Sequence, residues 1–157
     1  MVKETVQIGA DHAGFALKEH LKKFLQQKRY IVKDLGSHKL VKGDDYPDYA
    51  AKVARAVQRK GTGILVCGSA EGICIAANKF KGIRAVPVWT VQNAKLSREH
   101  NDANVLCLSG GKMKKRVAGV GLTDSQAEKI VIAWLKTQFS GAERHVRRIK
   151  KIARLEK

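Results

Sequence analysis

The sequence predicts an α/β protein with three layers, in which helices cover both faces of a doubly wound, five-stranded parallel sheet of the Rossmann-like class. Short apolar runs typical of buried strands alternate along the chain with segments whose apolar residues recur at helical spacing. Such alternation is typical of parallel βαβ units with right-handed crossovers. The 157 residues, of which 44% are hydrophobic, are enough for one core without disulfides or metals. We therefore expect a single domain over residues 1–157.

Five apolar runs, each bounded by glycine or polar residues, predict the strands. They cover residues 6–10, 30–36, 62–68, 83–89 and 104–110. The fourth run contains Pro87, and a proline cannot donate a hydrogen bond to a sheet ladder. This strand is therefore expected at an edge or with a bulge.

The segments between these runs predict helices. After "DHAG", an apolar stripe marks the first helix, and a second stripe follows Pro47, which suits a first helical turn. The first stripe is Leu17, His20, Leu21, Phe24 and Leu25, and the second is Ala50, Val53, Ala54 and Val57. Further helices are expected over residues 72–79, 91–101, 123–139 and, as a basic C-terminal helix, about 142–157.

The charge and the cysteines limit the classes of function. With 31 Lys and Arg against 14 acids, the net charge is +17, which predicts affinity for anionic substrates or polyanions. Nucleic acid is a less favoured partner, because aromatic residues are only 6% and form no stacking array. The three cysteines contain no CxxC pair, so we expect free thiols in a reducing compartment. Without a secretion signal or a run of about 20 apolar residues, the chain is expected to be cytoplasmic and not membrane-bound.

Chemically active side chains follow the predicted strands. Asp11 and His12 follow the first strand, and Cys67 ends the third, directly before the turn "GSAEG". His100 and Asn101 end the helix after the fourth strand. Each could be an ordinary core, loop or capping residue. Because ligands of doubly wound sheets bind beyond the carboxyl ends of the strands, we expect these side chains to converge on that edge.

Five motifs, in order, resemble those of the B-type ribose-5-phosphate isomerases, a family that also contains the galactose-6-phosphate isomerase subunits. They are "GADHAG", "DYPDYA", "CGSAEGICIAANKFKGIRAV", "EHNDANVLCLSGGK" and "FSGAERHVRRIKKI", and they extend over residues 9–152. The resemblance implies an enzyme that interconverts an aldose phosphate and a ketose phosphate without metal or cofactor. It also implies a homodimer, or a dimer of dimers, whose active site lies at the subunit interface.

The resemblance assigns the roles of individual residues. Cys67 matches the base, Ser69 the assisting hydroxyl and His100 the histidine that opens the furanose ring. A helix N-terminus can lower the pKa of a thiol, so an ionised Cys67 is expected. The backbone N–H groups of the turn are expected to face the enediolate oxygen. Contacts with the sugar are expected from Asp11, His12, Tyr46, Gly68, Ala70, Glu71, Gly72, Asn101 and Lys112. For Tyr46, packing against the following helix is an equal alternative.

Phosphate recognition is expected from His12 and from Arg144 and Arg148, which share one helix face because they are four residues apart. Arg147 lies on another face and is expected to be a surface charge. Three departures from the family pattern concern the preferred substrate. Ala70 replaces a usual glycine, Glu71 adds a negative charge that would raise the pKa of a nearby Cys67, and Lys112 stands where an arginine is usual.

The predicted function is the interconversion of ribose 5-phosphate and ribulose 5-phosphate through an enediol, with Cys67 as the base. One alternative is a hexose-6-phosphate isomerase of the same family. Another, of a different class, is a polyanion-binding protein that has lost catalysis; the presence of Cys67, His100, Asp11, Arg144 and Arg148 disfavours it.

Overall fold

The structure, a computed structural model, describes residues 5–111 and 121–156. Its centre is a five-stranded sheet in the order β2-β1-β3-β5-β4, in which every neighbouring pair is parallel. The strands are β1 (Thr5–Ala10), β2 (Ile31–Asp34), β3 (Thr62–Cys67), β4 (Ala85–Pro87) and β5 (Val105–Ser109). The predicted fold class is confirmed, and Pro87 ends the edge strand β4 as expected.

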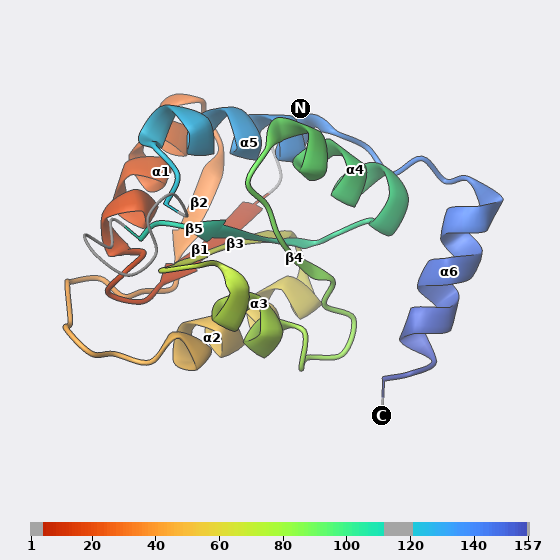
Figure 1. Cartoon of the computed structure of the whole chain (residues 1–157), viewed down its shortest axis with the longest axis horizontal. Helices are drawn as coiled ribbons and strands as arrows, with labels where there is room; N and C mark the ends of the chain where they lie inside the picture. The colour runs from red at the N-terminus through yellow and green to blue at the C-terminus, as the bar shows by residue number, and fades with distance from the viewer. Residues whose placement is uncertain (1–4, 112–120, 157) are drawn as a thin grey trace.

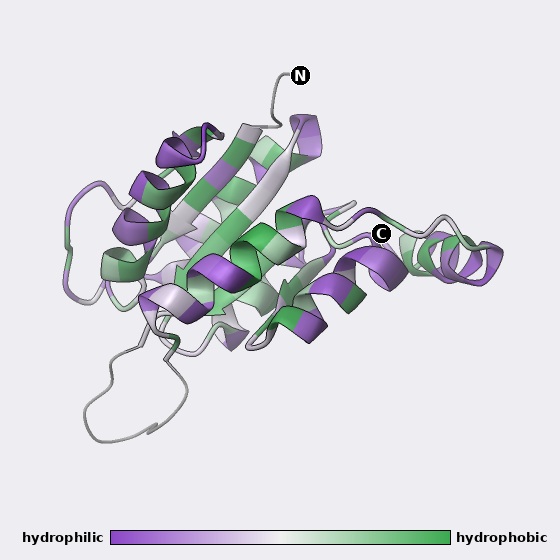
Figure 2. Ribbon diagram, turned by 90° about the horizontal axis from the view of Figure 1, so that it is seen from above, coloured by the Kyte–Doolittle hydropathy of each residue, from purple (hydrophilic) through white to green (hydrophobic). Residues whose placement is uncertain are grey.

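Helices cover both faces of the sheet (Figure 1). They are α1 (Phe15–Gln27), α2 (Tyr46–Arg59), α3 (Glu71–Ala77), α4 (Val91–Asn101), α5 (Asp124–Lys136) and α6 (Glu143–Ala153). One face packs against α1, α4 and α5 around Trp134, and the other packs against α2 and α3 around Leu65. Apolar residues concentrate on the strands and on the inward faces of these helices (Figure 2). The sheet is thus buried on both sides, which explains its nearly continuous apolar runs.

Several predicted boundaries were too long. The second strand ends at Asp34 rather than Gly36, and α5 ends at Lys136 rather than Phe139. The start of α5 agrees with its sequence: Thr123 and Gln126 form a reciprocal capping box.

The apolar stripe predicted for α1 was wrong at one position. His20 is partly exposed, with its Nε2 2.7 Å from Glu128 Oε1, whereas Lys18 is fully buried. Burial of this lysine is possible because its Nζ donates to Asp34 Oδ2 at 2.8 Å and to Glu19 Oε1 at 2.6 Å. Although burial opposes the Asp34 charge, hydrogen bonds from Lys18 and Lys22 lower the pKa of Asp34 to about 2. The two carboxylates therefore compensate the positive charge of Lys18 and allow its side chain to be buried.

The last helix, α6, stands apart from the rest of the chain (Figure 1). It meets the body through α4, and its end is tied by a hydrogen bond from the Gly82 N–H to Glu156 Oε1 at 2.8 Å. Ile152 and Leu155 near this end are 44% and 79% exposed. Within the described residues, no helix is long and apolar enough to cross a membrane.

The turn from β1 into α1 lies directly on the end of β3. A Cβ atom on Gly14 would lie 2.3 Å from the carbonyl oxygen of Val66, although the Gly14 backbone (φ −96°) is one that alanine adopts easily. Glycine is required here by space alone. The absent side chain lets the loop after β1 approach Cys67.

We predict that Gly14→Ala lowers the free energy of unfolding by about 3 kcal/mol, because the backbone that the methyl group meets cannot move aside easily. Gly82→Ala is the control. A Cβ there meets open space, so only its left-handed backbone (φ +75°) costs stability, about 1 kcal/mol. Urea denaturation of both variants gives the comparison, and equal losses would contradict the close-approach argument.

Candidate active site

Cys67 is the last residue of β3, where it pairs with Ser109 of β5, and its side chain is only 4% exposed. It lies in the core cluster on the α2 and α3 face of the sheet, together with Cys74 and Cys107. All three cysteines are free and buried. Cys67 is therefore a strand residue rather than a residue of an open loop, and it reaches the surface only at the carboxyl edge of the sheet.

Two opposing influences act on the Cys67 thiol. Burial raises its pKa, and the negative charge of Asp11 raises it further. Backbone N–H groups of Ile73, Ser69 and Ala70 act in the opposite direction and lower the pKa, but the net direction is upward. The expectation of an ionised thiolate is therefore wrong for the chain on its own, because burial outweighs the start of the helix. The carboxylate that acts on Cys67 is Asp11, whereas Glu71 is exposed.

The "GSAEG" turn is held by hydrogen bonds from the last residue of β5 and from the residue that follows it. Ser109 Oγ donates to the Gly68 carbonyl at 2.6 Å, and the Gly110 N–H donates to the Cys67 carbonyl at 2.9 Å. The N–H groups of Ser69 and Ala70 favour the charged form of Cys67, because they lower its pKa. They are placed to stabilise negative charge on Cys67 when it forms.

Ala70 has a left-handed backbone (φ +70°) directly before α3. A residue with a side chain costs of order 1–3 kcal/mol in this region, which explains why glycine is usual at this position of the motif. Beside it, Tyr46 packs over the start of α3: a Cβ on Gly72 would lie 2.6 Å from Tyr46 Cζ. Tyr46 is thus both the first residue of α2 and a side wall next to the Cys67 turn.

Asp11 and His12 lie at the same edge. The Asp11 carboxylate accepts the N–H groups of Ala13 and Gly14 at 3.1 and 3.0 Å, and burial raises its pKa. His12 is paired with Asp44, a residue that the sequence analysis did not single out, with 2.8 Å between Nδ1 and Oδ1. The carboxyl edge of the sheet therefore collects Asp11, His12, Tyr46, Cys67, Gly68, Ser69, Ala70, Glu71 and Gly72.

His100 and Asn101 are not at this edge, contrary to expectation. They end α4, which runs back across the sheet for about 16 Å from the carboxyl end of β4. Their place is fixed by Arg84, directly before β4, whose Nε donates to the carbonyls of Asn101 and Asp102 at 3.0 Å. Helices that follow parallel strands return antiparallel to them, so the end of α4 lies at the amino edge of the sheet.

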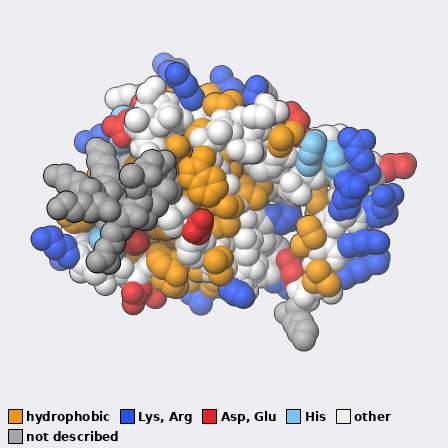
Figure 3. All heavy atoms as spheres, in the orientation of Figure 1, with side chains coloured by type: hydrophobic (Ala, Val, Ile, Leu, Met, Phe, Trp, Pro, Cys, Tyr) orange, Lys and Arg blue, Asp and Glu red, His pale blue; other side chains and the backbone are white. Residues whose placement is uncertain are grey.

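The second group of residues forms where α4 meets α6. The ring centroids of His100 and His145 are 4.3 Å apart, and His145 Nδ1 is 2.7 Å from Ser140 Oγ. Desolvation, together with the charges of His100, Arg144 and Arg148, lowers the pKa of His145. The two predicted phosphate-binding arginines therefore lie beside the predicted ring-opening histidine. Figure 3 shows basic side chains gathered along this end of the molecule.

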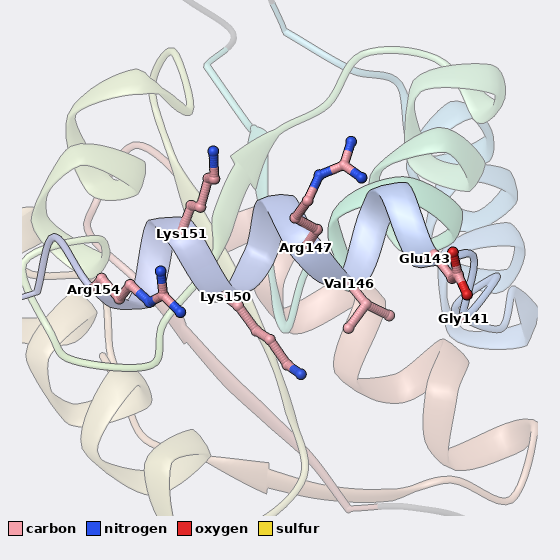
Figure 4. A pocket seen from close by; sticks show the side chains of 7 residues that line it. All are labelled: Gly141, Glu143, Val146, Arg147, Lys150, Lys151 and Arg154. Carbon is pink, nitrogen blue, oxygen red and sulfur yellow. The ribbon is translucent and has the colours of Figure 1, made fainter.

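Other cations of α6 face a shallow pocket of about 380 Å³ (Figure 4). The pocket is lined by Gly141, Glu143, Val146, Arg147, Lys150, Lys151 and Arg154. Arg144 and Arg148 do not line it, which agrees with the expected separation of Arg147 from them. No residue with a predicted role in catalysis or substrate binding contributes to this pocket.

One chain thus carries two half-sites at opposite edges of its sheet. We call the group around Cys67 the carboxyl-edge half-site and the group of His100, Asn101, Arg144, His145 and Arg148 the amino-edge half-site. Lys112 lies outside the described residues. Within residues 5–111 and 121–156, no group of three or more His, Cys, Asp or Glu side chains is arranged to hold a metal ion.

Two residues of these half-sites carried no prediction. His145 lies inside the motif "FSGAERHVRRIKKI", and its position next to Arg144 is the sequence signal that could identify it. Asp44 gave none, because its contact with His12 joins residues 32 positions apart. Such a pairing depends on how the loop after β2 folds back.

Comparison with known proteins finds one family that this chain resembles over nearly its whole length. The sequence model of a family described as ribose/galactose isomerase matches residues 6–152. The chain is 44% identical to a probable ribose-5-phosphate isomerase B of Mycoplasma genitalium, over 96% of this chain and 94% of that protein. It is 42% identical to ribose-5-phosphate isomerase B of Escherichia coli, over 96% and 95% of the two chains.

Solved structures agree with the sequence matches. The crystal structure of ribose-5-phosphate isomerase B from Mycoplasma genitalium with bound ribulose-5-phosphate has a TM-score of 0.88 at 43% identity, covering 97% of this chain and 95% of that chain. The type B enzyme of Trypanosoma brucei has a TM-score of 0.87 at 38% identity, covering 98% and 99%.

We predict that Asp11→Asn moves the pH dependence of Cys67 alkylation by iodoacetamide to lower pH. The Asp11 charge raises the pKa of Cys67, so its removal leaves more thiolate at any pH below that pKa. Asn keeps an acceptor for the Ala13 and Gly14 N–H groups. Asp124→Asn, an exposed carboxylate in the first turn of α5, is the control. Peptide mass spectrometry measures the rate of alkylation at Cys67. An unchanged pH dependence in Asp11→Asn would show that Asp11 does not raise the pKa of Cys67.

Proposed function

The chain belongs to the ribose/galactose isomerase family, and on this premise we propose that it interconverts ribose 5-phosphate and ribulose 5-phosphate. The observation that carries the proposal is Cys67 at the carboxyl end of β3, directly before the turn into α3 and at the same edge of the sheet as Asp11 and His12. A solved relative that is 43% identical contains bound ribulose-5-phosphate, which supports a five-carbon sugar phosphate as substrate here.

The reaction moves one proton between neighbouring carbons. In the open-chain aldose, the Cys67 thiolate takes the proton from C2, the carbonyl oxygen at C1 becomes negative, and an enediolate forms. Return of the proton to C1, with transfer of the C2 hydroxyl proton to the C1 oxygen, gives the ketose. The backbone N–H groups of Ile73, Ser69 and Ala70 lower the pKa of Cys67, so they reduce the cost of forming the thiolate. The Ser69 hydroxyl assists the developing oxyanion.

The amino-edge half-site supplies the remaining roles. His100 opens the furanose ring by moving a proton from the C1 hydroxyl toward the ring oxygen as the bond between C1 and that oxygen breaks. Arg144 and Arg148 bind the phosphate, for which planar guanidinium groups are well suited. His12 adds a contact to the phosphate, while Asp11, Tyr46 and Asn101 bind hydroxyl groups of the sugar.

A complete site requires two copies of the chain. The two half-sites lie at opposite edges of one sheet, so neither copy can surround a five-carbon substrate alone. We infer a homodimer in which the carboxyl-edge half-site of one subunit faces the amino-edge half-site of the other. The exposed apolar end of α6 fits such an interface. The cations of the partner would then lower the pKa of Cys67, which the isolated chain holds high.

The cellular compartment that fits this activity is the cytoplasm. All three cysteines are free, as expected in a reducing compartment.

The proposed base is tested by Cys67→Ala in a coupled assay with ribose 5-phosphate and ribulose 5-phosphate. We expect kcat to fall by roughly 10²–10⁴-fold, the usual contribution of a positioned base, with a much smaller change in KM. Cys74→Ala removes a second buried thiol on the same face of the sheet and is the control. A Cys67→Ala protein that keeps most of its kcat contradicts the mechanism. Faster turnover of six-carbon phosphates by the unaltered protein would instead favour the hexose-phosphate alternative.

The shared site is tested by mixing two inactive variants, Cys67→Ala and His100→Asn. After random exchange of subunits, half of the dimers are mixed and each contains one intact site, so about a quarter of the normal activity should return. Size-exclusion chromatography of differently tagged subunits checks that mixed dimers form. If they form and activity does not return, Cys67 and His100 act within one subunit.

A further inference from the structure

His12 is held by a single carboxylate at two points. Its backbone N–H donates to Asp44 Oδ1 at 2.7 Å, and its ring Nδ1 is 2.8 Å from the same oxygen. The Asp44 side chain is 9% exposed, while the His12 side chain is 41% exposed. The carboxylate is therefore almost enclosed, and the imidazole that it holds remains open to a ligand.

Asp44 is itself fixed from the other side. The Tyr49 hydroxyl, one turn into α2, donates to Asp44 Oδ2 at 2.8 Å. The loop that carries Asp44 is also tied to β1, because the Ser37 N–H donates to the Ala10 carbonyl at 3.0 Å. Each oxygen of Asp44 thus has its own donor, and the chain Tyr49–Asp44–His12 crosses from α2 to the turn after β1.

The pairing determines which protons the imidazole carries. An ionised carboxylate only accepts hydrogen bonds, so Nδ1 of His12 must carry the proton that Oδ1 accepts. In a neutral ring, Nε2 would then be an acceptor and would repel a phosphate oxygen. In the imidazolium, Nε2 also carries a proton and can donate to phosphate. Contact with phosphate through Nε2 therefore requires the cation.

We propose that Asp44 is a positioning residue for substrate recognition: it orients His12 and keeps it as the imidazolium that donates to the phosphate group of the sugar phosphate. This inference rests on the proposed function and adds to it a residue and a charge state. A carboxylate that fixes the partner nitrogen of a histidine is a general means of setting its tautomer and raising its basicity.

The surrounding charges act in the same direction. The hydrogen bond to Asp44 raises the pKa of His12, and the negative charges of Asp11 and Asp44 raise it further against a desolvation effect that lowers it. Although burial opposes the Asp44 charge, hydrogen bonds from His12 and Tyr49 lower the pKa of that carboxyl group. The pair therefore stays ionised over a wider pH range than either group would alone.

The experiment compares Asp44→Asn with the unaltered protein in two measurements. Asn keeps an oxygen for the His12 donors but removes the charge. The first measurement is an NMR titration of the imidazole signals without substrate, with the His12 signal identified from its loss in His12→Gln. We expect the His12 midpoint to move to lower pH in Asp44→Asn. Asp48→Asn, an exposed carboxylate in the first turn of α2, is the matched control and should leave the midpoint in place.

The second measurement is KM for ribose 5-phosphate as a function of pH. Between the two midpoints, His12 is cationic only in the unaltered protein, so KM of Asp44→Asn should be higher there by up to about tenfold, with kcat little changed. Titration of the substrate phosphate affects both proteins equally and cancels in the ratio. A merely structural role would change KM by the same factor at every pH.

The outcomes separate the two proposals. An unmoved His12 midpoint in a folded Asp44→Asn protein overturns the role of Asp44, whatever the activity. A moved midpoint without a pH-dependent difference in KM overturns its role in substrate recognition. Absence of isomerase activity in the unaltered protein with every sugar phosphate tested would instead count against the proposed function, while the titration still decides whether Asp44 sets the charge of His12.

Discussion

The carboxyl-edge half-site depends on backbone segments that touch one another without intervening side chains. Gly14 lies against the Val66 carbonyl, and a Cβ on Gly110 would lie 3.1 Å from the Cα of Gly14. This contact brings the turn after β1, the end of β3 and the loop after β5 together. It places the Asp11 carboxylate close enough to raise the pKa of Cys67. It also lets the Ser109 hydroxyl donate a hydrogen bond to the Gly68 carbonyl. A single added methyl group would separate these three segments.

The same close packing determines the chemistry of the cysteine. An open thiol at a helix start is expected to ionise easily, but the thiol of Cys67 is buried at the end of a central strand. Burial and the Asp11 charge outweigh three N–H donors, so the chain alone holds the proton on sulfur. Positive charge must come from elsewhere for a base to form. Among the described residues of the proposed machinery, histidine and arginine concentrate at the other edge of the sheet. The proposed dimer would therefore connect the protonation of Cys67 to assembly.

Much of the fold could be predicted from local patterns, because apolar runs and helical stripes reflect burial directly. The edge position of Pro87 and the Thr123 cap belong to this class. The wrong or missing predictions involve contacts between residues that are far apart in the sequence. Lys18 of α1 is buried because Asp34 of β2 compensates its charge, and His12 is held by Asp44, which lies in the loop after β2. The predicted convergence of His100 with Cys67 on one edge was wrong because α4 returns antiparallel to the strands and ends at the amino edge of the sheet.

The division of the machinery between two edges also bears on how such a protein can diverge. In an enzyme whose reacting groups all lie in one subunit, a gene copy that loses any of these groups encodes an inactive protein. In the proposed shared site, a duplicated copy could lose its cysteine while the other loses its histidine, and a mixed dimer would still contain one complete active site. Each chain could then accumulate substitutions in the half-site that no longer takes part in catalysis. Selection would act on the activity of the dimer and not on that of either chain alone. A homomeric ancestor with separated half-sites is thus already suited to become an obligate heteromer.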